Sequence, residues 1–207
     1  MDSSPARNRV TPLGEIVAIP LRGAWTGNRG ILHSGREIVR NHASDLWITC
    51  VLEFRSRWRE QWLPRRYTHL FFHDEAVSFA AGHRPCGECR RSAYVQYRDA
   101  WAAELGGAAP SAREMNRRLH AERLRGRGRR LHELPWRGLP DGAFVLLDEG
   151  PAVVAGDALT EWTTAGYGTR HRRPRAGTAR VVTPPSTVAV LRAGYPVQID
   201  ACGTECT

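Results

Sequence analysis

The chain of 207 residues carries 30 basic and 21 acidic side chains, a formal net charge of +9. Its hydrophobic fraction of 42% and charged fraction of 25% are ordinary for a globular protein and exclude wholesale disorder. This length suits one domain, whose core needs neither metal nor disulfides merely to fold. No segment approaches the ~20 apolar residues of a membrane span, and the polar N-terminus lacks the apolar core of a signal peptide, so we expect a cytoplasmic protein.

The first predicted elements follow a tail, over residues 1–13, that we expect to be flexible. Asp74 predicts the start of a short helix, because aspartate caps helix N-termini well, and Gly82 ends that helix. Runs of β-branched and aromatic residues predict strands over 15–21, 46–54 and 67–72.

The second half of the chain is helical at first and then mixed. Residues 90–105 place apolar side chains at helical spacing, and Ser111 with Glu114 fits a capping box that starts another helix. A hairpin is predicted around residues 149–150, and residues 188–192 fit either a helix or a strand.

Strands and helices that are segregated along the chain predict an α+β fold, a single domain with a zinc knuckle between its strands and helices. Within it, we expect residues 14–133 to form a zinc-containing basic α+β region. Residues 134–207 are expected to form a C-terminal α+β extension packed on that region.

The nature of the positive charge points to DNA as the partner. Every basic residue is an arginine, because the chain contains no lysine. A guanidinium group pairs bidentately with phosphate and with guanine edges, and a surplus of such charge attracts a polyanion whatever its sequence. We expect no membrane binding, and the lack of a phosphate-binding glycine loop argues against a nucleotide cofactor.

Cys86 and Cys89 form a Cys-x-x-Cys pair that predicts a zinc site, because one tight turn lets both thiolates reach the same ion. A redox pair or two unrelated core cysteines are the alternatives. A tetrahedral zinc needs two more ligands, and Cys50 with a histidine is favoured over the rival pair Cys202 and Cys206. The histidines near in sequence are His33, which we take as the candidate, and His69, His73 and His83.

Residues 72–90 read FHDEAVSFAAGHRPCGECR. This segment resembles the second half of the zinc-binding domain at the N-terminus of Ada-type DNA alkylation-repair proteins. In that family an acidic run and a short alanine-rich helix precede Ala-Gly-aromatic-Arg-Pro-Cys-x-x-Cys-Arg. The matching residues are Ala81, Gly82, Arg84, Pro85, Cys86, Cys89 and Arg90, with His83 in place of the aromatic residue. The resemblance implies zinc and DNA contact around the knuckle. The family's first cysteine pair, one member of which is the methyl acceptor, is missing here, and Cys50 is the one cysteine upstream of the segment.

Arginines and aromatic residues near the knuckle are the candidates for nucleic-acid contact. Arginine pairs with phosphate, and an aromatic ring beside it can stack on an unpaired or flipped base. The alternative for these arginines is a solvated surface without a ligand. The alternative for the tryptophans is a place in the hydrophobic core. The candidates are Trp25, Asn28, Arg29, Arg65, Arg66, Arg84, Arg90, Arg91 and Tyr167.

For catalysis, a monofunctional DNA glycosylase needs a carboxylate beside the sugar, and the absence of lysine excludes a lysine Schiff base. Asp74 is favoured because it lies next to the knuckle, although it could be a helix cap only. The other candidates are Glu75, Asp157 and Glu161, with His33 as an assisting acid or base. Residues 85–89 also match the second half of the zinc deaminase pattern, but no His-x-Glu precedes them.

These features predict a zinc-containing enzyme that hydrolyses a base–sugar bond in modified or damaged DNA, in repair or in defence against foreign DNA. The alternatives are a zinc-containing DNA-binding protein or regulator without catalysis, and an Ada-like zinc-thiolate alkyl acceptor. An enzyme should have a deep pocket, a binder only a convex basic face, and an alkyl acceptor an exposed thiolate that reacts once.

Overall fold

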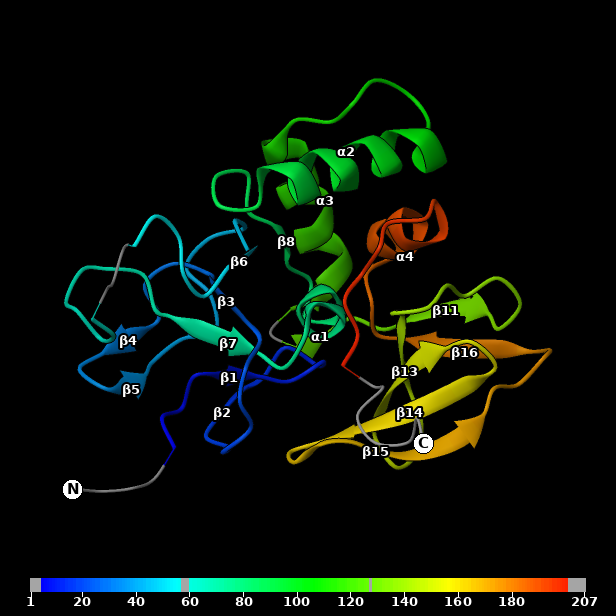
Figure 1. Cartoon of the computed structure of the whole chain (residues 1–207), viewed down its shortest axis with the longest axis horizontal. Coiled ribbons are helices and arrows are strands. Elements are labelled where there is room, and N and C mark those ends of the chain that lie inside the picture. Colours follow the sequence, from blue (N-terminus) through cyan, green and yellow to red (C-terminus); the bar gives the residue numbers. More distant parts are fainter. Residues whose placement is uncertain (1–4, 57–59, 127, 201–207) are drawn as a thin grey trace.

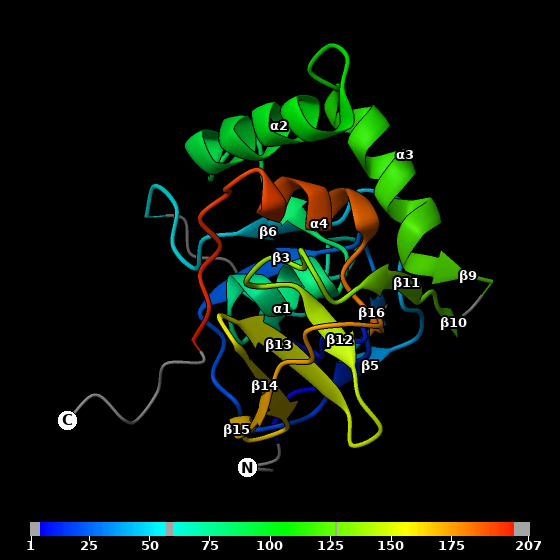
Figure 2. The same ribbon diagram turned by 90° about the vertical axis from the view of Figure 1, so that its right-hand side faces the viewer.

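The computed structural model describes residues 5–56, 60–126 and 128–200 and has the α+β architecture expected from the sequence. Two six-stranded sheets lie on either side of a short central helix, and three further helices pack together at one end (Figures 1 and 2). No helix within the described ranges has the length and apolar character needed to cross a bilayer.

The first sheet comes from the N-terminal 85 residues and carries the candidate site. Its central strand β3 (Trp25–Asn28) pairs antiparallel with β6 (Ile48–Cys50) on one side and with β7 (Leu70–Phe72) on the other. At one edge, β8 (Arg84–Pro85) runs parallel to β6. The strand order is β2 (Ile16–Val17), β1 (Arg9–Val10), β7, β3, β6, β8. A two-stranded ribbon, β4 (His33–Ser34) with β5 (Glu37–Ile38), follows β3.

The expected flexible tail over residues 1–13 is in part ordered. Arg9 and Val10 form β1, between β2 and β7, and the Val10 side chain is 2% exposed. Asn8 is 1% exposed, and its carbonyl accepts a hydrogen bond from the Phe71 amide at 2.8 Å. Burial of Val10 with Ile16 and Leu70 ties this segment to the sheet, a contact that no local pattern in the polar N-terminus indicates.

The second sheet is antiparallel throughout and belongs to the C-terminal region. Alternate residues of β12 face different cores, since Val145 packs towards the helices and Phe144 packs towards α1. The predicted boundary near residue 133 falls within β11. The strands, in sheet order, are β11 (His132–Pro135), β16 (Thr178–Val181), β12 (Phe144–Leu146), β13 (Pro151–Ala155), β14 (Ala158–Thr163) and β15 (Gly166–Arg172).

The helices join the two sheets into one body. Every residue of α1 (Glu75–Ala80) is buried, with Phe79 facing the helical core and Val77 facing the second sheet. The remaining helices are α2 (Arg91–Leu105), α3 (Ala112–Arg123), which begins with the predicted capping box, and α4 (Pro185–Arg192). Val190 of α4 and Tyr97 of α2 share one core with strands of the second sheet, so the C-terminal residues pack on the N-terminal region.

A group of buried arginines closes the C-terminal end of α1. Arg129, in the hairpin of β9 (Leu124–Arg125) and β10 (Gly128–Arg129), donates to the Ala81 carbonyl at 3.1 Å, and Arg123 donates to the Gly82 carbonyl at 2.9 Å. These carbonyls are the negative end of the helix dipole, which favours cations there. Burial lowers the pKa of both guanidinium groups to about 9, and for Arg123 the neighbouring charge of Arg129 acts in the same direction.

Candidate metal centre

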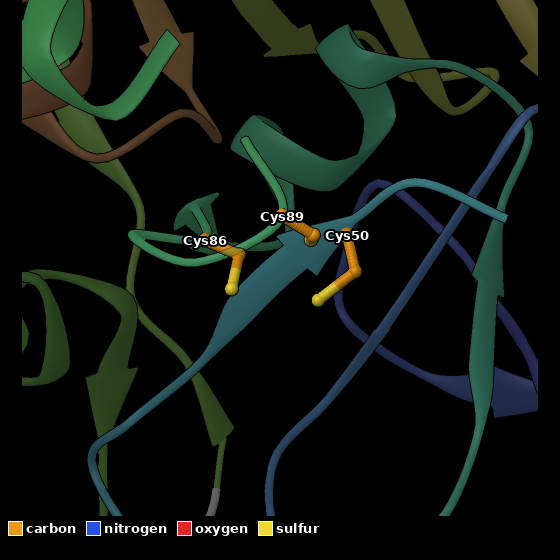
Figure 3. A group of neighbouring side chains, drawn as sticks. All are labelled: Cys50, Cys86 and Cys89. Atoms are coloured by element: carbon orange, nitrogen blue, oxygen red, sulfur yellow. The ribbon is translucent and has the colours of Figure 1, made fainter. Parts of the chain in front are cut away.

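Three cysteine thiols meet at the edge of the first sheet. Cys50 ends β6, and the parallel pairing of β6 with β8 sets Pro85 opposite Thr49, so that the chain enters the Cys-x-x-Cys turn beside Cys50. The Cys86 amide donates to the Thr49 carbonyl at 2.9 Å and the Arg90 amide to the Cys86 carbonyl at 3.2 Å, which fixes the turn. The three sulfur atoms lie within 4.8 Å of one another, with their side chains turned towards one space (Figure 3).

The hydrogen-bonding around the thiols favours ionisation of one of them. A hydrogen bond from the Cys50 thiol lowers the pKa of Cys86 to about 5, and the backbone amides of Cys89 and Glu88 act in the same direction. The pKa of Cys50 is raised by its hydrogen bond to Cys86 and by burial, and burial also raises the pKa of Cys89. A metal ion bound by all three sulfurs displaces the remaining protons, because the thiolate is the form that ligates.

The predicted trio Cys50, Cys86 and Cys89 is therefore close enough to hold a metal ion. The expected fourth ligand, His33, does not join it within the described residues. Its ring nitrogens lie 2.6 Å from the Thr68 hydroxyl and 3.3 Å from the Leu63 carbonyl. The rival pair Cys202 and Cys206 lies outside the described residues.

Of the other histidines considered as ligands, His73 and His83 have partners outside the cavity, whereas His69 lines it. His83 is fully buried and accepts from Arg29 at 3.2 Å, and His73 is 3.2 Å from the Asp200 carboxylate. His69, by contrast, lines the same cavity as the three cysteines. Structural zinc sites carry four protein ligands and catalytic sites three, and the described residues gather three thiols, with His69 in the same cavity wall.

A cavity of about 350 Å³ adjoins the three sulfurs. Its wall includes the aromatic side chains of Phe54, Tyr67 and Phe71. Phe71 lies on β7, and Tyr67 and His69, at alternate positions before that strand, line the same cavity. We expected a strand over residues 67–72 and named His69 as a possible zinc ligand; the strand covers only Leu70–Phe72, and His69 lines the cavity of the three cysteines.

Polar groups complete the cavity wall. Asn28 lies at the end of β3, Gln61 follows the loop after β6, and Glu88 lies between the two cysteines of the turn. Glu88 is the single carboxylate among the described lining residues, and its side chain is exposed, which places it at the rim. Glu88 and Gln61 were not among the predicted site residues.

The favoured catalytic carboxylates lie elsewhere. Asp74 is fully buried and accepts three hydrogen bonds, from the Val77 amide at 2.7 Å, the Tyr167 hydroxyl at 2.7 Å and the Asp200 amide at 2.9 Å. Burial raises the pKa of the Asp74 carboxyl group.

Glu75 is 2% exposed and is held by Arg90, by the Tyr195 hydroxyl at 2.9 Å and by the Gln198 amide at 3.2 Å. Both carboxylates hold the start of α1 and the C-terminal segment together, and neither lines the cavity.

The remaining catalytic candidates are also away from the cavity. Asp157 is exposed in the turn between β13 and β14. Glu161 on β14 lies 2.5 Å from His171 on β15. His33 is buried with Thr68. The geometry gathers none of the five predicted catalytic residues at the metal centre.

The nucleic-acid candidates divide by burial. Arg29 is fully buried and Arg84 is 3% exposed, with Arg84 donating to Asn116 at 2.8 Å, so neither can reach a phosphate from these positions. Arg90 pairs with Glu75 and its guanidinium lies 4.0 Å over the Trp25 ring. Tyr167 and Trp25 are half-buried, and they donate to Asp74 and to Gln198 respectively. The exposed candidates are Arg65, Arg66 and Arg91, and Asn28 lines the cavity.

Replacing Asp74 with alanine tests its assignment as a structural residue. We expect the free energy of unfolding to fall by roughly 1–3 kcal/mol, because the helix cap is lost and two further donors lose their acceptor. Ser111→Ala at the exposed cap of α3 is the matched control, with an expected loss of about 1 kcal/mol. Urea unfolding measures both, and metal content should not change. A loss at Asp74 no larger than that at Ser111 would contradict the role of the buried contacts.

The chain matches no protein-family model, no curated protein and no solved structure.

Proposed function

We propose that this protein binds zinc through Cys50, Cys86 and Cys89 and acts on modified or damaged DNA, with one base of the strand received in the cavity beside the metal. The observation that carries the proposal is that all three thiols belong to the wall of that cavity. A metal held by these three thiols would lie beside the space that a ligand in the cavity occupies.

Zinc is the metal that best fits the ligand set. Thiolates select soft or borderline metals over calcium and magnesium, and a Cys-x-x-Cys turn with one further cysteine is a frequent zinc arrangement. The resemblance of residues 72–90 to the Ada-type zinc module supports the same choice. A zinc ion bound here would supply Lewis acidity and would keep its thiolate ligands deprotonated.

The size and lining of the cavity suit a single base. Its volume of about 350 Å³ is at the small end of the range of ligand pockets. Phe54, Tyr67 and Phe71 provide aromatic surface on which a planar ring can stack. Enzymes that act on a base in DNA take it out of the helical stack into such a pocket.

Exposed arginines lie next to cavity residues in the sequence. Arg55 follows Phe54, with its guanidinium 4.9 Å over the Phe54 ring, and Arg66 precedes Tyr67. Arg91 comes two residues after Cys89. With the net charge of +9, these groups can hold the phosphates on either side of an inserted base.

The reaction that we propose is hydrolysis of the bond between the inserted base and its sugar. With the base in the cavity, the sugar would lie near the rim, where Glu88 is the one carboxylate among the described lining residues. Glu88 takes the place of Asp74, Glu75, Asp157 and Glu161 as the acid or base of the reaction.

Alkyl transfer to a thiolate is a second candidate, and one observation favours it. Cys50 and Cys89 are half-buried, and both line the cavity, so an alkyl group on a bound base or phosphate could be brought to a zinc-activated sulfur. Such a reaction occurs once per protein molecule and leaves the alkyl group on cysteine.

The test is incubation of the zinc-loaded protein with DNA carrying natural and alkylated bases, followed by hot alkali. We expect strand breaks that appear only after alkali, and Glu88→Gln should slow their formation about 10²–10⁴-fold. Glu133→Gln, on an exposed strand residue outside the cavity, is the matched control. Breaks without alkali would mean a nuclease and contradict base–sugar hydrolysis. No breaks, with the mass of one alkyl group gained by a cysteine peptide, would establish the second candidate.

A further inference from the structure

We infer that the cavity beside the metal centre selects a base by its hydrogen-bond acceptors, through the amide NH₂ groups of Asn28 and Gln61, and therefore receives a keto-type base in preference to an amino-type base. This inference rests on the proposed function, because it specifies the ligand of the same cavity. It depends on which end of each amide is already engaged by the protein.

The orientation of the Asn28 amide is set by the backbone. The Gly30 amide lies 3.3 Å from Asn28 Oδ1. A backbone N–H can only donate, so the atom facing it must be the carbonyl oxygen of the side chain. The NH₂ group is the other end of this cavity-lining amide, and it presents donors only.

The orientation of the Gln61 amide is set by a relay of two residues. Arg9 donates from Nη1 to Asn8 Oδ1, and a guanidinium can only donate. The Asn8 amide must then present its nitrogen, and Asn8 Nδ2 donates to Gln61 Oε1 at 3.0 Å. The oxygen of Gln61 is thus occupied, and its NH₂ group is again the end available to a ligand.

Further contacts of Asn8 and Arg9 stabilise these hydrogen bonds and thereby the orientation of the Gln61 amide. Asn8 is 1% exposed, and its backbone carbonyl accepts from the Phe71 amide. The Arg9 guanidinium lies 4.9 Å over the Phe71 ring and donates from Nε to the Leu21 carbonyl at 2.8 Å. Turning the Gln61 amide would place two NH₂ groups against each other, which costs the hydrogen bond.

Charge decides between two kinds of acceptor. Phosphate oxygens accept hydrogen bonds as well as carbonyl oxygens do, but three thiolates exceed the charge of one divalent ion, and Glu88 at the rim adds a further negative charge. Aromatic walls also favour a flat neutral ring. The acceptor that fits is therefore the carbonyl oxygen of a base such as hypoxanthine, guanine, uracil or thymine.

The experiment uses the zinc-loaded full chain and two single-stranded oligonucleotides that differ in one central base, hypoxanthine or adenine. These bases differ at the exocyclic position, where one has a carbonyl and the other an amino group. We expect the hypoxanthine strand to bind about tenfold more tightly, equivalent to about 1.4 kcal/mol. Uracil against cytosine is the second matched pair. Added inorganic phosphate, at constant ionic strength, should leave the ratio unchanged.

Asn28→Asp with Gln61→Glu is the decisive variant, because each change replaces only the NH₂ group by an oxygen. The oxygens that accept from Gly30 and Asn8 are retained, and the preference for hypoxanthine should be lost or reversed. Gln96→Glu on the exposed face of α2 is the control for added negative charge and should keep the tenfold ratio. Zinc content is measured on every variant, so that loss of metal is not mistaken for loss of recognition.

The outcomes distinguish a failure of this inference from a failure of the proposed function. Equal binding of both strands, or an unchanged ratio in the double variant, overturns the donor assignment and leaves the base-binding cavity standing. Competition by phosphate that abolishes the ratio shows that the donors hold a phosphate instead and also overturns the inference. If neither strand binds more tightly to the zinc-loaded protein than to the metal-free protein, the proposed function fails and the inference fails with it.

Discussion

Replacing Cys86 with serine is expected to reduce the zinc content of the purified protein from about one ion per chain to almost none. Cys86 is one of the three thiols that the structure brings together, and its lowered pKa favours the thiolate form, which is the form that ligates a metal. Loss of one of the three thiolate ligands is expected to lower the zinc affinity steeply, because each thiolate contributes a bond and a negative charge to the site. Elemental mass spectrometry of freshly purified protein gives the ratio directly, and Cys50→Ser should give the same result.

The matched control is a double variant with serine at Cys202 and Cys206. It should keep full zinc content if the ligands are the three cysteines that the structure brings together. Loss of zinc in this variant, with retention in Cys86→Ser, would show that the C-terminal pair is the true site. Removal of zinc by a chelator should lower the melting temperature without unfolding the chain, because the three hydrophobic cores contain none of these cysteines.

Trp47→Ala is expected to lower the free energy of unfolding by about 3–5 kcal/mol, the largest effect on stability that we predict. Trp47 is 3% exposed, and its ring lies between two guanidinium groups, with Arg29 at 3.9 Å and Arg123 at 3.8 Å from the ring centre. Removing the ring leaves a cavity and takes from two desolvated cations the aromatic faces that stabilise them. Denaturant unfolding monitored by circular dichroism measures the loss.

Trp47→Phe is the control, since it keeps an aromatic ring between the two cations and should cost clearly less. Arg91→Ala, on an exposed residue, should change stability by less than about 0.5 kcal/mol. A Trp47→Ala variant as stable as the control would show that hydrogen bonds to backbone carbonyls and to His83 and His120 hold the buried arginines without the ring. Zinc content should be unaffected in all three variants, because Trp47 is not among the residues of the cavity.

For several predicted candidate residues, burial and partners distant in the sequence decided the role that the structure gives them. Arg29, Arg84 and Arg90 look like phosphate contacts in the sequence, where an arginine is normally exposed. The structure buries the first two, while Arg90 pairs with Glu75, fifteen residues away. For Asp74, the helix-cap alternative holds, and its other partners Tyr167 and Asp200 come from the far end of the chain.

The strands β14 and β15 show that the prediction of the fold also depends on partners that are distant in the sequence. Residues of β14 and β15 were not predicted as strands; β15 is rich in glycine and arginine and has Thr169 as its one β-branched residue. Pairing with β13 and β14 forms them, through backbone hydrogen bonds that require no particular side chains. The α+β class was predicted correctly because it depends on the strongly patterned segments.

The sequence by itself determined the features that depend on local chemistry. These are the α+β class, the capped helices after Asp74 and Ser111, and the pair Cys86 and Cys89, since capping and Cys-x-x-Cys spacing act within a few residues. Tertiary structure decided what depends on strand pairing. The parallel register of β6 and β8 brings Cys50 to the turn, and the alternation of side chains across β3, β6 and β7 turns Asn28, Cys50 and Phe71 towards one cavity. Such pairing joins residues far apart in the chain, and no short stretch of sequence encodes it.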